Sequence, residues 1–126
     1  MSKRTYHPDR GDLVEMNFQP AATRLSSSKS GREIDKRRPA VVLSPLAYNR
    51  KTGLCLAVPT STDLTPGPLW LPMPSGYLPR PSLILCDYLK SFDYRERAAT
   101  LIARLPEELV DQIVSNVLDL IDPVRS

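Results

Sequence analysis

The feature that most constrains the fold of this chain is residues 37–45, which read RRPAVVLSP. The run of small and branched apolar residues between two prolines predicts a strand that is buried on both faces. Pro39 restricts the residue before it to an extended conformation, so Arg38 enters the fold at a fixed position. The stretch therefore predicts a buried strand that carries a pre-positioned cation at its start.

The length and composition indicate one small, loop-rich β domain. A chain of 126 residues can bury one core without disulfides or metal, so we expect a single domain over residues 1–126. Its 13 prolines favour a β protein with many loops. The net charge of +3 fits an anionic partner, although many proteins with this charge bind nothing acidic. Neither a signal peptide nor a membrane-spanning segment stands out, so we expect a cytoplasmic protein without membrane contact.

The cysteines and the histidine do not suggest a catalytic thiol or a metal centre. Cys55 and Cys86 each lie in an apolar run, where a thiol usually serves as a small buried side chain. The single histidine, His7, lies in the polar N-terminal segment of residues 1–10, and no metal-ligand spacing is present. We therefore expect reduced, structural cysteines, no metal and no cofactor.

Short apolar runs alternate with turn residues along the chain. They predict strands at residues 12–18, 54–60, 69–73, 83–86 and 98–104, in addition to the run described above. Pro72 confines its strand to a sheet edge. The asparagine and glycine of residues 48–53 predict a hairpin connection, and Phe18 and Tyr48 are expected in the core.

One helix is predicted at the C-terminal end. Pro106 is expected at its first helical position, with Glu107 and Glu108 near the positive end of the helix dipole. Apolar residues recur at helical spacing and form one stripe: Leu109, Val110, Ile113, Val114, Val117, Leu120 and Ile121. Short strands followed by one helix predict a mainly β fold, a small and strongly curved sheet or barrel with the helix packed on it.

Residues 20–37 form a polar, basic segment between the first two predicted strands. A loop of this length inside a compact domain is usually functional or disordered. We expect it to be mobile in the free protein and ordered over a ligand. The alternative is a solvated hairpin loop that happens to be basic.

Several short motifs follow one another in a characteristic order. They are GDLV at 11–14, RPAVVLSP at 38–45, YN-x-KTG at 48–53, VPTST at 58–62, LCD at 85–87 and KS at 90–91. In this order they resemble the MazF/PemK family of toxin endoribonucleases. The resemblance spans residues 11–121 and implies an SH3-like barrel of the kind shared with the gyrase-poisoning toxin CcdB. It also implies a homodimer that cuts single-stranded RNA at selected sequences and is neutralised by an antitoxin.

The residue types present restrict how such a chain could cut RNA. Attack by the 2′-hydroxyl of the RNA needs a base, an acid and positive charge around the phosphorus. A two-histidine mechanism is impossible within one chain, and no acidic cluster with metal-site spacing is apparent, so we expect metal-independent cleavage. Arg38 can hold two phosphate oxygens in a bidentate manner. Its alternative role is an ion pair with Asp12 or Glu15.

Two further catalytic candidates depend on the resemblance. Ser61 falls where the family usually has a catalytic threonine, and it keeps the hydroxyl. Its alternative role is to cap backbone groups at a strand end. Glu33 has the same spacing from Arg38 as a loop glutamate of the family and is the candidate general base. Asp35 competes for this role, and either carboxylate could simply be solvated.

The remaining candidates would bind RNA. Single-stranded RNA is held by bases stacked on aromatic or arginine planes and by cations along the backbone. The expected binding residues are Lys29, Arg32, Lys36, Arg37, Thr60, Thr62, Trp70, Tyr77, Arg80, Asp87 and Lys90. Tyr88 stands where the family more often has glutamine, which leaves the recognised RNA sequence open.

Two alternative functions remain, together with one expected partner. A gyrase-binding toxin on the same barrel is disfavoured because those toxins use a tryptophan near the C-terminus, whereas the only tryptophan here is Trp70. A catalytically silent barrel is disfavoured because the candidate site residues are retained. The expected partner is an antitoxin whose disordered acidic and apolar tail folds over the RNA site.

Overall fold

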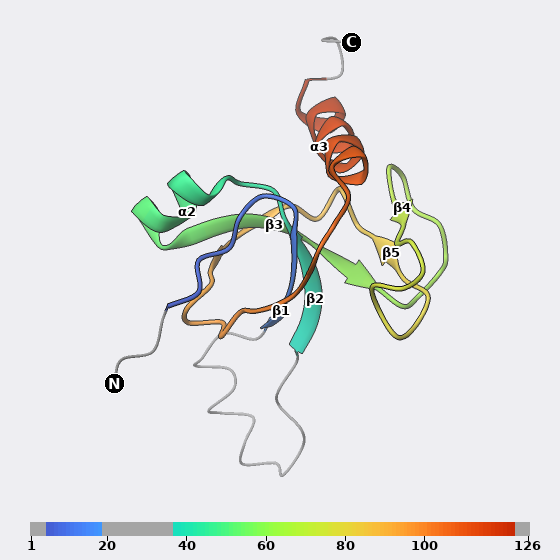
Figure 1. The fold of residues 1–126 in the computed structure, drawn as a ribbon. Helices are drawn as coiled ribbons and strands as arrows, with labels where there is room; N and C mark the ends of the chain where they lie inside the picture. The colour runs from blue at the N-terminus through green and yellow to red at the C-terminus, as the bar shows by residue number, and fades with distance from the viewer. Residues whose placement is uncertain (1–4, 19–36, 123–126) are drawn as a thin grey trace, which may run out of the picture.

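A computed structural model describes residues 5–18 and 37–122 of the chain. Its elements are β1 (Asp12–Asn17), β2 (Arg37–Val42), α2 (Leu46–Thr52), β3 (Leu54–Ser61), β4 (Leu71–Pro72), β5 (Leu83–Ile84), β6 (Lys90–Asp93), β7 (Thr100–Arg104) and α3 (Glu107–Ile121) (Figure 1). The candidates Lys29, Arg32, Glu33, Asp35 and Lys36 lie outside the described residues, as does nearly all of the predicted basic loop.

The strands form one antiparallel sheet that curls around its longest member, β3. The strand order is β4-β5-β3-β2-β1-β7, and β6 also pairs with β3. β3 uses its first half, from Leu54 to Ala57, to pair with β6 and its last two residues to pair with β5. One long strand thus belongs to both halves of the sheet, which produces the mainly β, curled architecture expected from the sequence (Figure 1).

The predicted central strand is buried on both faces. Val41 belongs to a core cluster that includes Val110, Ile113 and Val117 of α3. Its neighbours Ala40 and Val42 belong to a second cluster, which contains Phe92 and Tyr94. Because side chains alternate along a strand, the apolar run contributes to both cores.

Residues 48–53 lie between the antiparallel neighbours β2 and β3, as the predicted hairpin connection requires, but they belong to the helix α2 and its C-cap rather than to a turn. Gly53 ends the helix with φ 77°. Pro45 supplies no side-chain cap, and the Oδ1 of Asp9 instead accepts a hydrogen bond from the Leu46 amide at 2.9 Å. The capping residue thus lies far away in the sequence, which explains why local turn signals were misleading. Tyr48 on this helix is 41% exposed and is not the core residue that we expected.

Three other expectations need adjustment. Pro106 is the N-cap of α3 rather than its first helical residue. β6 was not predicted, because its residues Lys90–Asp93 carry charges on an exposed edge of the pairing with β3. β4 is shorter than predicted but lies at the end of the strand order, as Pro72 required.

The apolar stripe of α3 is only partly covered. Val110, Ile113 and Val117 are buried, whereas Leu120 and Ile121 at the end of the helix are exposed. No helix among the described residues is long and apolar enough to cross a membrane.

Candidate functional site

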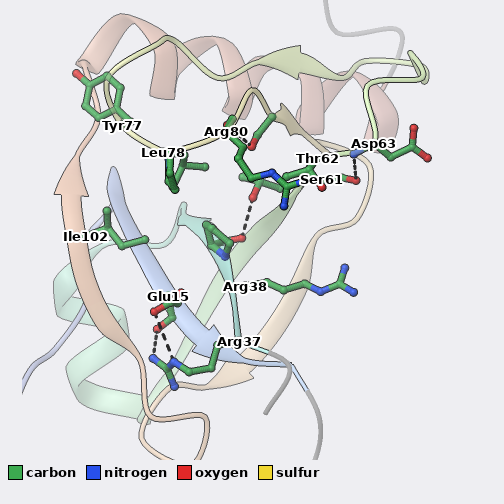
Figure 2. A pocket seen from close by; sticks show the side chains of 14 residues that line it. Glu15, Arg37, Arg38, Ser61, Thr62, Asp63, Tyr77, Leu78, Arg80 and Ile102 are labelled. Atoms are coloured by element: carbon green, nitrogen blue, oxygen red, sulfur yellow. Dashed lines mark hydrogen bonds and ion pairs between the residues drawn. The ribbon is translucent and has the colours of Figure 1, made fainter. Parts of the chain in front are cut away.

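A cavity of about 610 Å³ opens where β2 begins and β3 ends, and we call it the Arg38 cavity. Figure 2 shows its side chains, which come from β1, β2, β3, β7, the segment directly after β3 and the loop between β4 and β5. The lining residues are Glu15, Arg37, Arg38, Pro39, Thr60, Ser61, Thr62, Asp63, Tyr77, Leu78, Pro79, Arg80, Ser82 and Ile102. The fold thus brings Arg38, Ser61 and most of the described RNA-binding candidates to one place.

The pairing of β2 with β3 sets Arg38 against Ser61. Ala40 pairs with Pro59, Val41 with Val58 and Val42 with Ala57. Continuing this register outward by two residues places Arg38 opposite Ser61. A hydrogen bond of 3.3 Å from the Thr60 hydroxyl to the Pro39 carbonyl supports that continuation. Side chains directly opposite on antiparallel strands share a face, so the guanidinium and the hydroxyl can reach one ligand.

Arg38 is exposed and makes no ion pair or hydrogen bond within the described residues. The two partners considered for it are engaged elsewhere, since Asp12 binds Arg104 and Glu15 binds Arg37. The structural ion pair considered from the sequence is therefore wrong. The guanidinium of Arg38 points away from the Glu15–Arg37 pair (Figure 2).

Arg37 lines the same cavity, but protein groups occupy its guanidinium. Its Nη2 donates to the backbone carbonyls of Glu15 at 2.8 Å and Ala98 at 2.9 Å, and to the Thr100 hydroxyl at 3.3 Å. Its Nε lies 3.6 Å from the Glu15 carboxylate. Arg37 thus ties β2 to β1 and β7, and its expected contact with RNA stays a prediction.

Ser61 at the end of β3 can fill both roles considered for it, capping a backbone group and donating to a phosphate. The Ser61 Oγ accepts a hydrogen bond from the Asp63 amide at 3.0 Å, which is the strand-end cap. Its own hydroxyl proton remains free to donate to a ligand. The carboxylate of Asp63 accepts from the Thr65 amide at 3.0 Å, and this bond lowers the pKa of Asp63. Asp63 is therefore ionised at neutral pH, a poor arrangement for a proton donor.

The opposite wall of the Arg38 cavity is apolar. Tyr77 and Leu78 from the loop before β5 face Ile102 from β7 (Figure 2). Ile102 was missed because a single isoleucine in an edge strand looks like any core residue. Glu15 was considered only as an ion-pair partner of Arg38, because the residue that it faces across β1 and β2 could not be known without the register.

Trp70, Asp87 and Lys90 do not line the Arg38 cavity. The Trp70 indole nitrogen donates to the Asp87 carboxylate at 2.6 Å, and its ring meets Tyr88 edge-on at 6.2 Å between centroids. Lys90 begins β6 and pairs with Ala57. Trp70 and Asp87 are thus bonded to each other away from the Arg38 cavity, and contact of all three candidates with RNA stays a prediction.

The cysteines are free and buried, as expected. Burial raises the pKa of Cys55 to about 12 and that of Cys86 to about 11. Both thiols are therefore neutral at physiological pH and unsuited to act as nucleophiles. Among the described residues, no group of three or more histidine, cysteine or acidic side chains could hold a metal ion.

A second cavity of about 560 Å³, the Arg104 cavity, lies beside the start of α3. It is lined by Asp9, Arg10, Gly11, Pro45, Arg104, Leu105, Glu107, Val110 and Asp111. Its arginines are paired, because Arg10 lies 3.6 Å from Asp111 and Arg104 binds Asp12 and Asp9. It therefore offers little free positive charge.

Comparison with known proteins identifies close relatives. Residues 9–121 match the family model described as "PemK-like, MazF-like toxin of type II toxin-antitoxin system". The endoribonuclease toxin MazF of Escherichia coli K12 is 42% identical over 105 residues, which cover 82% of this chain and 86% of the relative.

Solved structures agree with the family match. MazF of Deinococcus radiodurans has a TM-score of 0.76 at 34% identity, with 93% of this chain and 98% of the other covered. The MazE–MazF complex of the same organism gives a TM-score of 0.75 at 31% identity and covers 94% and 98% of the two chains.

Proposed function

This chain belongs to the family of PemK-like, MazF-like toxins of type II toxin–antitoxin systems, and we propose that it is a single-domain endoribonuclease that cuts single-stranded RNA. The observation that supports this most strongly is that Arg38, which has no ion-pair partner among the described residues, is set opposite Ser61 in a cavity that can admit a nucleotide. The curated relatives are named as endoribonucleases, which favours this activity over gyrase binding or a silent barrel.

The Arg38 cavity has the groups needed to hold a phosphodiester. Arg38 and Arg80 bring positive charge that no described carboxylate neutralises, and Ser61 brings a hydroxyl donor. A guanidinium binds two phosphate oxygens at once and stays charged. Because the crowded phosphorane carries more negative charge than the phosphodiester, the guanidinium stabilises it more than it stabilises the ground state.

In the reaction that we propose, the 2′-hydroxyl of the RNA attacks the adjacent phosphorus. The P–O5′ bond breaks, leaving a 2′,3′-cyclic phosphate on one product and a free 5′-hydroxyl on the other. The 2′-hydroxyl loses a proton to a base and the departing O5′ gains one. Glu33 remains our candidate for the base and lies outside the described residues. Metal independence remains part of the proposal.

We also propose two protein partners. The Deinococcus relative was solved together with MazE, so we expect a cognate antitoxin here, with a tail that competes with RNA for the Arg38 cavity. We expect a homodimer, because the edge strand β7 leaves Leu101 50% exposed at the end of the sheet. Because the substrate is RNA, we expect the protein to act in the cytoplasm.

Mapping of cleavage sites by primer extension on a long defined RNA tests the activity. Cleavage should persist in EDTA and should stop when the scissile nucleotide carries a 2′-deoxy group, although that oligonucleotide should still bind. Activity that needs added magnesium, or efficient cutting of the deoxy substrate, would show that water is the nucleophile. An Arg38→Ala variant that cuts as well as the wild type would contradict the assignment of the site.

A further inference from the structure

The Arg38 cavity has two chemically different ends. Arg80, Ser61 and Thr62 lie together at one end, and Arg38 projects on the side away from Glu15 (Figure 2). Tyr77, Leu78 and Ile102 form an apolar wall along the other side, with Tyr77 at its far edge and Glu15 beyond Ile102 (Figure 2). An RNA phosphate fits the first end. The second end fits a flat, partly apolar group that also carries hydrogen-bond donors.

Glu15 presents a carboxylate at this second end whose one ion-pair partner among the described residues is Arg37. Its side chain is 45% exposed and accepts no hydrogen bond from the described residues, since its only partner is the Arg37 Nε at 3.6 Å. Arg37 also binds the Glu15 backbone carbonyl at 2.8 Å, which fixes this part of β1. The carboxylate is thus held at the cavity wall with acceptor positions that no described residue fills.

We propose that Glu15 reads the base of a nucleotide next to the scissile phosphate and selects a base that carries an exocyclic amino group. This proposal rests on the proposed endoribonuclease function and adds a residue that determines specificity. The apolar wall of Tyr77, Leu78 and Ile102 receives the face or edge of the base. The Glu15 carboxylate accepts from its amino group, as carboxylates do from cytosine N4.

The same chemistry rejects uracil. Uracil presents one N–H between two carbonyl oxygens, so at least one oxygen would face the carboxylate and repel it. Cytosine, adenine and guanine each present an amino group, and guanine adds a second donor beside it. When uracil is bound, the half-exposed Glu15 carboxylate has no amino group to accept from. The complex then lacks the interaction energy that a good base contact supplies.

The strand register argues against Glu15 as the general base. Glu15 pairs with Pro39, so its side chain shares a face with Pro39 and Arg37, and Arg38 projects from the opposite face of β2. Ser61 shares the face of Arg38 by the continued register. A phosphate held by Arg38 and Ser61 therefore lies away from the Glu15 carboxylate, which reaches instead towards the nucleotide beyond it.

The test uses short RNA substrates built on the sequence that the wild-type protein cuts, with all four bases placed in turn at each position flanking the scissile bond. We expect wild type to require an amino-bearing base at one position. Glu15→Gln should lower kcat/KM for that base by about tenfold or more and improve cutting of uracil, because an amide offers a donor as well as an acceptor. Glu15→Ala should lose the preference without favouring uracil.

Each contrary outcome has a distinct meaning. A uniform loss of kcat on every substrate, with the acid limb of the pH profile removed, would show that Glu15 is the base and would overturn its reading role. An unchanged base preference would also overturn it, whether or not the melting temperature falls. Glu108→Gln, an exposed carboxylate of α3 outside both cavities, serves as the matched control and should cut like wild type. If wild type cuts no RNA, the proposed function itself fails.

Discussion

The Arg38 cavity and the Arg104 cavity are similar in size but opposite in the state of their charges. The first has three arginines against two carboxylates on its lining, and the second has two arginines against three. In the Arg104 cavity each arginine faces an aspartate, whereas Arg38 and Arg80 in the other cavity have no such partner among the described residues. Similar volume and residue types thus give different chemistry.

This difference shows that pairing, more than the number of arginines, decides which cavity can receive an anion. A phosphate entering the Arg104 cavity would meet carboxylates and would have to displace an existing ion pair. A phosphate bound by Arg38 and Arg80 would displace no ion pair of theirs among the described residues. The Arg104 cavity is therefore expected to contribute to stability and the Arg38 cavity to activity.

The largest expected effect is that of Arg38→Ala on catalysis. We expect kcat to fall by roughly 100- to 1000-fold, the usual loss when one donor to a developing anion is removed. The melting temperature should stay within about 1 °C of wild type, because Arg38 has no hydrogen-bond or ion-pair partner among residues 5–18 and 37–122. Single-turnover cleavage of a fluorescent RNA and thermal melting by circular dichroism check both points. A large loss of melting temperature would show that Arg38 serves the fold.

The complementary substitution removes Asp12, the buried ion-pair partner of Arg104. Asp12 is 3% exposed and accepts hydrogen bonds from Arg104, from the Tyr6 hydroxyl at 2.6 Å and from the Asp9 amide at 3.0 Å. Asp12→Asn should lower the free energy of unfolding by roughly 2–3 kcal/mol, because charge-assisted bonds to a buried group are lost. Chemical denaturation measures this cost.

Cleavage provides the control for Asp12→Asn. Activity per folded molecule should match wild type, because Asp12 does not line the Arg38 cavity. The exposed partner of Arg10 supplies a matched comparison, and Asp111→Asn should cost less than about 0.5 kcal/mol. If Asp12→Asn removed activity while leaving stability intact, the division of roles between the cavities would be wrong.

Much of the fold followed from local sequence signals. The buried run at residues 40–42, the terminal helix and the proline-limited edge strand each depend on neighbours within a few positions, and each is confirmed. The helix α2 was missed because the amide at its N-terminus donates its hydrogen bond to Asp9, which is distant in sequence. Residue type alone could not reveal such a contact.

The residues of the candidate site also divide into those that local motifs predicted and those that only the strand pairing revealed. Arg38 and Ser61 could be selected from motifs, and the register then places them opposite each other. The different roles of Arg37 and Arg38 could not be predicted, because adjacent arginines look alike until the strand alternation sends them to opposite faces. Glu15 and Ile102 entered the site only through the pairing of β1 with its neighbours.

A smaller effect is expected at Ser61. Ser61→Ala should lower kcat/KM by about tenfold, because one hydrogen bond to the charged phosphate is lost. Ser61→Thr should keep most of the activity, since it retains the hydroxyl with a more restricted rotamer. Steady-state kinetics on one RNA substrate compares the three proteins. Equal losses for Ala and Thr would argue against a phosphate contact of the hydroxyl, because the threonine variant retains that hydroxyl.

The smallest expected effect is on RNA affinity, measured after one exposed arginine of each cavity is replaced by alanine. Arg80→Ala should weaken RNA binding severalfold and make log Kd less dependent on log salt concentration by a slope of about one, because one phosphate contact and its released counterion are lost. Arg10→Ala removes the same charge, but that charge is paired with Asp111, so the salt slope should stay at the wild-type value. Titrations of a non-cleavable 2′-deoxy oligonucleotide at several salt concentrations give both slopes. If the two substitutions reduced the slope equally, net charge rather than unpaired charge would govern binding, and the distinction between the two cavities would fail.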